Sequence, residues 1–369
     1  MAYQNVGTPR FYINIAEWAN SVGDTIPWGA FSIGSQTTGW GGTAEESAMA
    51  QHFRTLPVTP SSIKASSLWM KSILPLSIDH GSGFIAFLGH TFASQGIKPT
   101  LTNEFPVTPP QATIPTVVTN FNDFINSDFA YDGFSIILTY NSFFDGTHVV
   151  FRVGDTLSAT SDGVVGSIVL GTYYDMPHSP DLSLTMTREY GGIKTIETKG
   201  GSSLSNAFYT KPPMWGNAAP WELYEVRDDG SIGSTSQGSA IQFNQSQKLA
   251  RSGRRIWDLS FSYLDDGDVF GSNQMISPRT GDVINQDLHD DDDTHDAFNF
   301  KYNLLTDNNF FSQVIHKTNG GQLPFIFQPD RNSPASDNFA ICKFDMKSFK
   351  FEQVANGVYN MKLKIREVW

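Results

Sequence analysis

Hydrophobic and polar residues alternate in many short segments of this chain, and a period of two residues predicts β-strands. The clearest case lies near the C-terminus, where apolar residues occupy every second position between polar ones: Tyr359, Met361, Leu363 and Ile365. The pair Asn356-Gly357 precedes this segment and predicts a hairpin turn. A second strong strand is predicted around Trp257, with Leu259, Phe261 and Tyr263 on the same face, and it ends at Asp265-Asp266-Gly267. These segments predict antiparallel sheets in the C-terminal part.

Other segments rich in β-branched and aromatic residues predict further strands. They are Arg10–Trp18, Gly83–Phe92, Gly133–Phe143, Thr147–Asp155, Ile168–Tyr173, Leu182–Arg188, Ile193–Lys199, 323–330, 339–346 and 348–354. Asp145-Gly146 lies between two of these segments and predicts a hairpin there, and Gly191-Gly192 predicts a tight turn between two others. Only one segment has a convincing helical period: Asp307–His316, which begins at a capping residue and is followed by Gly320-Gly321.

The chain has 369 residues, which is long enough for two domains with separate cores. The small polar segment Ser158–Gly163 is the best boundary, and it divides the chain into residues 1–157 and 158–369. Glu225–Ala250 is rich in Gly and Ser and predicts a long loop. We therefore predict a mainly β protein with two antiparallel β-sandwich-like domains, of which the C-terminal one carries one packed α-helix.

Composition suggests that partners cover part of the surface. Charged residues are only 17% of the chain, while aromatic residues are 13%. Aromatic and arginine side chains anchor many protein interfaces, so we single out the following as interface candidates: Arg254, Arg255, Trp257, Trp215, Trp221, Tyr359 and Ile365. For Arg254-Arg255 beside Trp257, an ion pair between subunits or a stacked guanidinium is the preferred interpretation.

Charge and hydropathy exclude several classes of partner and location. The net charge of −12 argues against binding of nucleic acid, which needs a basic surface. No apolar run approaches 18 residues, and the N-terminus lacks a signal-peptide pattern, so we expect a soluble protein made in the cytoplasm, without a membrane partner. The single cysteine, Cys342, lies in an alternating segment and is expected to be a buried thiol.

The segment Asp287–Asp296, DLHDDDDTHD, is the most obvious candidate for a metal site. A calcium loop of the helix-loop-helix type needs Gly at its sixth position and a carboxylate at its twelfth, where this chain has Asp292 and Phe298. Consecutive aspartates repel one another and favour a hydrated loop, which is the preferred interpretation. Weak cation binding stays open for the carboxylates of Asp287, Asp290, Asp291, Asp292 and Asp293.

Motifs for catalysis are missing from the sequence. It has no Gly-x-Ser-x-Gly elbow, no phosphate-binding Gly-rich loop and no His-Glu-x-x-His, so we expect neither an enzyme nor a bound cofactor. Glu189, Glu197 and Glu222 supply a carboxylate pair of the glycosidase kind only by chance proximity. A carbohydrate-binding or carbohydrate-active protein is therefore a minor alternative.

Several segments of residues 158–369 resemble structural proteins of tailed bacteriophages, in particular tail proteins of the tail-tube and distal-tail type. The resemblance rests on GRRIWDLSFSYLDDGDVF, on a helix ending in Gly-Gly, on the PFIF strand and on the final LKIRE strand. It implies a β-sandwich flanked by a helix, assembled as a homo-oligomeric ring around a channel through which DNA passes without specific binding. Other tail or head proteins are then partners, and the location is the virion.

The resemblance also guides two finer expectations. Strand edges such as Val358–Arg366 pair across subunits, and acidic segments such as Asp265–Asp268 face the channel. A capsid decoration or fibre-attachment protein is the main alternative, because it shares this composition. Closed rings favour the tail protein, whereas separate trimers or monomers favour decoration.

Overall fold

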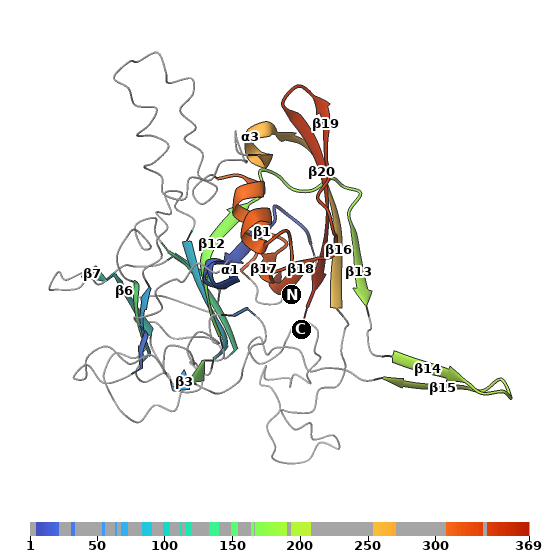
Figure 1. Ribbon diagram of the computed structural model, residues 1–369, viewed down its shortest axis with the longest axis horizontal. Coiled ribbons are helices and arrows are strands. Elements are labelled where there is room, and N and C mark those ends of the chain that lie inside the picture. The colour runs from blue at the N-terminus through green and yellow to red at the C-terminus, as the bar shows by residue number, and fades with distance from the viewer. Residues whose placement is uncertain are drawn as a thin grey trace, which may run out of the picture.

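The structure of the chain is a computed structural model, which describes residues 5–21, 31–33, 54–55, 63–64, 68–72, 83–90, 99–103, 111–112, 116–119, 133–139, 149–153, 164–165, 167–189, 193–207, 254–270, 308–334 and 338–368. Most of these residues belong to strands, and every strand pair is antiparallel (Figure 1). The prediction of a mainly β protein built from antiparallel sheets is confirmed.

Eleven strands form one large sheet, in the order β13-β16-β20-β18-β17-β1-β12-β5-β9-β8, with β19 paired to β20. Their bounds are β1 Arg10–Asn14, β5 Gly83–His90, β8 Thr116–Thr119, β9 Gly133–Thr139, β12 Ser167–Asp175, β13 Thr185–Glu189, β16 Arg254–Asp265, β17 Phe325–Gln328, β18 Ala340–Phe344, β19 Phe351–Ala355 and β20 Val358–Glu367. This sheet contains strands from both sides of residue 157, because β1 pairs with both β12 and β17. The division into two domains at that residue stays a prediction.

The remaining strands form three smaller sheets. One contains β2 (Phe31–Ile33), β4 (Leu68–Ser72), β10 (Val149–Val153), β6 (Pro99–Asn103) and β7 (Gln111–Ala112); the two others pair β11 (Val164–Val165) with β3 (Ile63–Lys64), and β14 (Ile193–Glu197) with β15 (Ser203–Ala207). The hairpin predicted around Asp145-Gly146 is wrong, since β9 and β10 belong to different sheets. That dipeptide itself lies outside the described residues.

The first predicted strand is shorter than its pattern indicates. Strand β1 ends at Asn14, and helix α1 follows at Ile15–Ser21. The Asn14 side chain accepts a hydrogen bond from the backbone N–H of Glu17 at 3.1 Å, which is the geometry of a helix N-cap. A local side-chain bond thus ends the strand where the apolar alternation alone would continue it.

The one predicted α-helix is instead a π-helical turn, η5 (Phe311–Ile315), followed by a 3₁₀ turn, η6 (His316–Thr318). Asn309 caps this segment by accepting from the N–H of Ser312 at 2.8 Å. At the other end, Gly320 and Gly321 adopt positive φ values of 67° and 87°, as the predicted stop requires. The prediction of a single regular α-helix is wrong: α1 and α3 (Asp266–Val269) are further helices.

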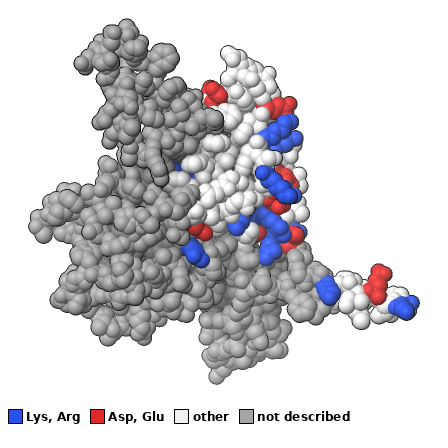
Figure 2. Space-filling view, in the orientation of Figure 1, with Lys and Arg blue, Asp and Glu red and all other residues white. Residues whose placement is uncertain are grey.

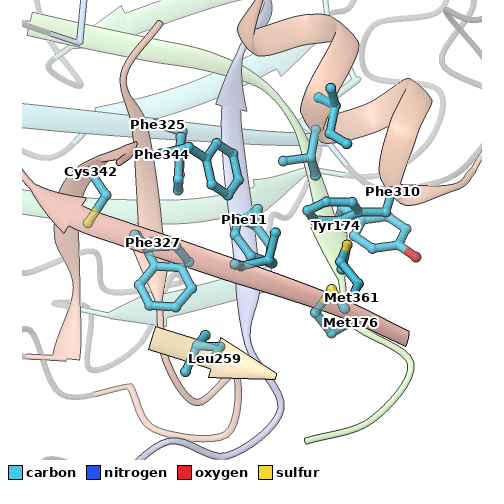
Figure 3. Close-up of a cluster of buried hydrophobic side chains, with 14 of the residues drawn as sticks. Phe11, Tyr174, Met176, Leu259, Phe310, Phe325, Phe327, Cys342, Phe344 and Met361 are labelled. Carbon is cyan, nitrogen blue, oxygen red and sulfur yellow. The ribbon is translucent and has the colours of Figure 1, made fainter. Parts of the chain in front are cut away.

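The main core lies on the face of the sheet that this helical segment covers. Side chains from β1, β12, β16, β17, β18, β20 and η5 meet there in one cluster. Figure 3 shows Phe11 near its centre, and its ring centroid lies 5.2 Å from that of Phe327 and 5.6 Å from that of Phe310. Trp257 reaches the same cluster through Phe327, at 5.2 Å. Cys342 is fully buried here, as predicted.

The opposite face of the sheet is apolar at one end of the strand order and charged at the other. Around β1, β5 and β9 this face is apolar and buried, with Tyr12, Phe84 and Ile136 in a second cluster. At the other end, the same face of β16 and β20 carries charged side chains that reach solvent.

Candidate assembly surface

Strands β16 and β20 have one apolar and one charged face. On the inner face, Trp257 pairs with Ile365 and Leu259 with Leu363, and all four side chains are buried. On the outer face, charged residues alternate with them and are exposed or half-buried: Arg254, Asp258, Lys362, Lys364 and Arg366. The predicted alternation is confirmed in β20, and in β16 as far as Phe261. Tyr263, which is predicted on the apolar face, is instead 80% exposed with a φ of 62°, because the register shifts between Phe261 and Leu264.

Beneath this outer face, Arg255 and Glu367 form a buried ion pair. The Arg255 guanidinium donates to both carboxylate oxygens of Glu367 at 2.9–3.3 Å, and the Arg255 backbone N–H donates to the same carboxylate at 2.8 Å. The guanidinium also donates to the Phe339 carbonyl and lies 5.2 Å from the Trp257 ring centroid. The predicted contact of Arg255 with Trp257 is confirmed, but this ion pair lies within one chain instead of between subunits.

Strand β13 is an open edge of the large sheet. In the part of the chain that the structure describes, β13 pairs with β16 alone. All five of its residues pair in an unbroken register, from Thr185 with Asp258 to Glu189 with Arg254, and the strand contains no proline. Proline and bulges are devices that protect sheet edges, and a regular edge without them offers backbone N–H and C=O groups to another strand.

The edge predicted at Val358–Arg366 is wrong, because β20 pairs with β16, β18 and β19. A strand with partners on both sides has no backbone groups left for a second subunit. Among the described strands, the free edge on this side of the sheet belongs to β13, which is the neighbour of β16.

Directly after β13, the strands β14 and β15 form a hairpin that we call the arm (Ile193–Ala207). Figure 1 shows the arm projecting away from the large sheet. Its side chains from Lys194 to Ser205 are all exposed. Ile196 and Leu204 pair directly across the arm and are 54% and 62% exposed. An isolated two-stranded hairpin is marginally stable in water, so an arm with two exposed apolar side chains is suited to a partner.

The arm is held locally by its turn. The Thr198 N–H donates to the Ser202 carbonyl, the Gly201 N–H donates to the Thr198 carbonyl, and Gly201 has a φ of 81°. This hairpin is not among the predicted elements, although Gly200-Gly201 between two segments of strand-forming residues is the signal for it. The tight turn predicted at Gly191-Gly192 lies outside the described residues, and among the described strands β14 pairs with β15 and not with β13.

The outer face of β16 and β20 carries Arg254, Lys362, Lys364 and Arg366 beside the acidic Asp258, and Figure 2 shows basic and acidic side chains intermixed on this side of the molecule. Arg366 donates to Glu189 at 2.5 Å, and Lys364 lies 3.3 Å from Asp345. Arg254 lies close to Arg366: partial burial, and then the charge of Arg366, lower the pKa of the Arg254 guanidinium. Arginine still stays charged at neutral pH. A locally basic face is notable on a chain whose net charge is −12.

The predicted interface residues occupy different environments. Arg255, Trp257 and Ile365 are at most 2% exposed and pack inside the chain itself, so they are core residues of the folded chain. Arg254 and Tyr359 are half-buried and keep some exposed surface. Trp215 and Trp221 lie outside the described residues.

Candidates for metal binding and catalysis find little support. The acidic segment Asp287–Asp296 and Glu222 lie outside the described residues, and the described ranges contain no group of three or more metal-ligating side chains. Of the remaining carboxylates, Glu189 is bonded to Arg366 on β20, whereas Glu197 is exposed on the arm. The structure does not bring these two into one described site.

Two buried polar groups are internal features of the fold. The His90 Nε2 and Ser135 Oγ atoms lie 2.6 Å apart, and burial lowers the pKa of His90 to about 3, so its ring stays neutral. Under η5 and η6, Lys317 Nζ donates to Gln313 Oε1 at 2.7 Å, and Thr172 donates to the same oxygen at 3.2 Å. Burial lowers the pKa of Lys317 to about 7. Because both groups are buried, we expect them to affect the stability of the fold and not the chemistry of the surface.

Comparisons with protein-family models, with curated proteins and with solved structures find no match. The resemblance to phage tail proteins therefore stays a prediction that rests on the residues alone. Among the helices of the described residues, none is long and apolar enough to cross a membrane.

Proposed function

We propose that this chain is a structural component of a tailed-phage virion, a tail or baseplate protein that assembles with copies of itself into a ring around a DNA channel. In this proposal the protein works through its contact surfaces and does not transform a small molecule. Its location is the virion, and its other partners are neighbouring tail or head proteins.

The observation that carries the proposal is the regular open edge of β13 next to the exposed arm. Both features are unfavourable in a monomer. An open edge allows uncontrolled pairing with other chains, and the exposed apolar residues of a projecting hairpin stay in contact with water. A chain that forms a permanent assembly covers both. The two features lie in one continuous stretch, Asp181–Ala207, which also includes the fully exposed Leu182.

The charge distribution supports the same proposal. The outer face of β16 and β20 is basic in an acidic chain, so one copy attracts the acidic surface of another. The net negative charge of the chain keeps passing DNA from binding, because tight binding needs a stripe of phosphate contacts.

The test is imaging of the purified full chain by negative-stain electron microscopy, together with its mass from light scattering. We expect closed rings and a mass of several chains. The double variant Ile196→Ser/Leu204→Ser is expected to shift the mass towards single chains. Lys350→Ser is a matched control on an exposed residue outside the arm and the β13 edge, and is expected to leave the rings unchanged.

Other outcomes contradict the proposal in distinct ways. Monomers at every concentration overturn it, and separate trimers favour the decoration or fibre-attachment alternative. Hydrolysis of a glycan by the purified chain overturns the structural role and favours the carbohydrate-active alternative.

A further inference from the structure

We infer that the arm of one copy adds a strand to the open edge of β13 in a second copy of this chain. The inference rests on the proposed function, because it names the contact through which copies assemble. It assigns two different patches of one chain, the arm and the β13 edge, to the two sides of a single interface.

The two patches match in length and kind. Strands β13, β14 and β15 each have five residues, and the arm has a free edge on either side in the described structure. Adding a strand to an exposed edge gives main-chain hydrogen bonds along its whole length, while alternate side chains provide the specificity. An arm docked in this way extends the large sheet.

The faces of the two patches also match. On the arm, Ile196 and Leu204 lie on one face together with Lys194, while Thr195, Glu197, Ser203 and Ser205 alternate onto the other. On β13, Met186 faces inward and packs partly against the main core, with Leu184 before it and Arg188 after it in the same row, whereas Thr185 and Thr187 are exposed outward. A docked arm with its apolar face inward places Ile196 and Leu204 beside Met186 and Leu184.

Charge complementarity selects the same orientation. With the apolar face inward, Glu197 of the arm points to the outer face of the neighbouring sheet. That face carries Arg254 and Arg366, which lie close together, with Glu189 bonded to Arg366. A further carboxylate there adds to the attraction that Glu189 and Glu367 already exert on the Arg254 guanidinium. The reverse orientation instead brings Lys194 to the basic face.

We take a second copy as the occupant because, among the described strands, the chain's own arm pairs with no strand of the large sheet. Only residues 190–192 separate β13 from β14, and the arm points away from the sheet in Figure 1. Since the arm and the edge are different patches, the contact is heterologous: each copy offers an arm to one neighbour and an edge to another. Repetition of such a contact gives a closed ring or an open filament.

The test is chemical cross-linking between two different single-cysteine additions. Thr187→Cys places a thiol on the outward face of β13, and Ser205→Cys places one on the polar face of the arm, which the inference brings to the same side. The two full-length variants, one of them labelled with nitrogen-15, are mixed and treated with a short bismaleimide. The native Cys342 is fully buried. Mass spectrometry then identifies peptides that join a labelled chain to an unlabelled one.

We expect a cross-link that joins the new thiol of the Thr187→Cys chain to the new thiol of the Ser205→Cys chain. Glu352→Cys, on the exposed strand β19, replaces Thr187→Cys in the control and is expected to give no such product. Adding Leu204→Ser to the arm partner is expected to reduce the yield at limiting protein concentration by about tenfold, the effect of losing one buried leucine.

The outcomes separate this inference from the proposed function. If wild-type chains assemble but Thr187→Cys gives no more product than Glu352→Cys, the inference is overturned while the proposed function stands. If the variant with both cysteines in one chain cross-links within monomers, the edge is closed by its own arm and the inference is also overturned. If neither assembly nor cross-link occurs, both ideas fail together.

Discussion

Two hairpins of this chain both turn at a glycine with a positive φ, but one is part of the large sheet and the other is exposed. The hairpin β19–β20 turns at Gly357 with a φ of 70°, and the arm β14–β15 turns near Gly201 with a φ of 81°. Strand β20 lies within the large sheet with four buried residues on its inner face, whereas the described side chains of the arm are all exposed. The difference lies in the apolar residues of each strand, since turn residues create a hairpin but only a continuous apolar row places it in a core.

The largest expected effect is in the buried half of this comparison. Trp257 is 1% exposed and packs against Phe327, so Trp257→Ala creates a large cavity. We expect it to lower the free energy of unfolding by about 3–5 kcal/mol, measured by chemical denaturation. Lys362→Ala, on the exposed face of the paired strand, is the control and is expected to change it by less than about 0.5 kcal/mol. Similar losses in both variants contradict the assigned inner and outer faces.

The buried ion pair gives the next effect. Glu367→Gln removes the negative partner of Arg255 and leaves a buried guanidinium without its counter-charge. We expect a loss of about 3 kcal/mol in the free energy of unfolding. The double variant Arg255→Met/Glu367→Gln is expected to lose less than Glu367→Gln alone, because no buried charge remains. Additive losses in this double-mutant cycle argue against the pair.

A smaller effect concerns the buried Lys317. Burial lowers its pKa in the folded chain to about 7, while an unfolded lysine has a pKa of about 10.4. The unfolded chain therefore binds more protons between these two pKa values, so the free energy of unfolding rises with pH across this window. Below pH 7 the lysine is charged in both states, and the full free-energy cost of burying its charge is present. We expect Lys317→Met to remove this part of the rise, which is at most about 1.4 kcal/mol per pH unit. Denaturation of both proteins at pH 7 and 9 checks it. An equal rise in both contradicts the assignment.

The smallest effect on folding is expected in the arm. Leu204 is 62% exposed, and Leu204→Ser is expected to change the free energy of unfolding by less than about 0.5 kcal/mol. The same change is expected to weaken assembly, because an exposed leucine gains burial only at an interface. Denaturation of dilute protein and light scattering of concentrated protein measure the two effects separately. A large loss of stability in dilute solution means that the arm belongs to the chain's own core.

Much of the sheet was predictable where one face alternates strictly with the other. The strands around Trp257 and Met361 and the turn at Gly357 follow from local pattern, because burial on one face imposes a period of two. The end of β1 depends on a side-chain cap by Asn14. The π-helical turn depends on contacts such as Thr172 with Gln313, which join distant parts of the sequence. Neither is visible in the apolar pattern.

The candidate surface was harder to predict than the fold. The order of strands decides which edge is free. Residues 358–366 have the same alternating pattern whether they form a central strand or an edge strand. The apolar pattern therefore predicts the free edge at β20, whereas among the described strands it lies at β13. Residue type and pattern also predict Arg255, Trp257 and Ile365 as interface anchors, but these three side chains lie in the core. Residue type does not distinguish an interior contact from one between chains.

The most direct measurement is sedimentation equilibrium of the full-length chain over a wide range of concentrations, beside the Ile196→Ser/Leu204→Ser variant. The account predicts that the wild-type mass is a multiple of 40.8 kDa, while the variant sediments as smaller species at equal concentration. A wild-type mass of one chain at every concentration contradicts it, and so does a variant that assembles as fully as the wild type.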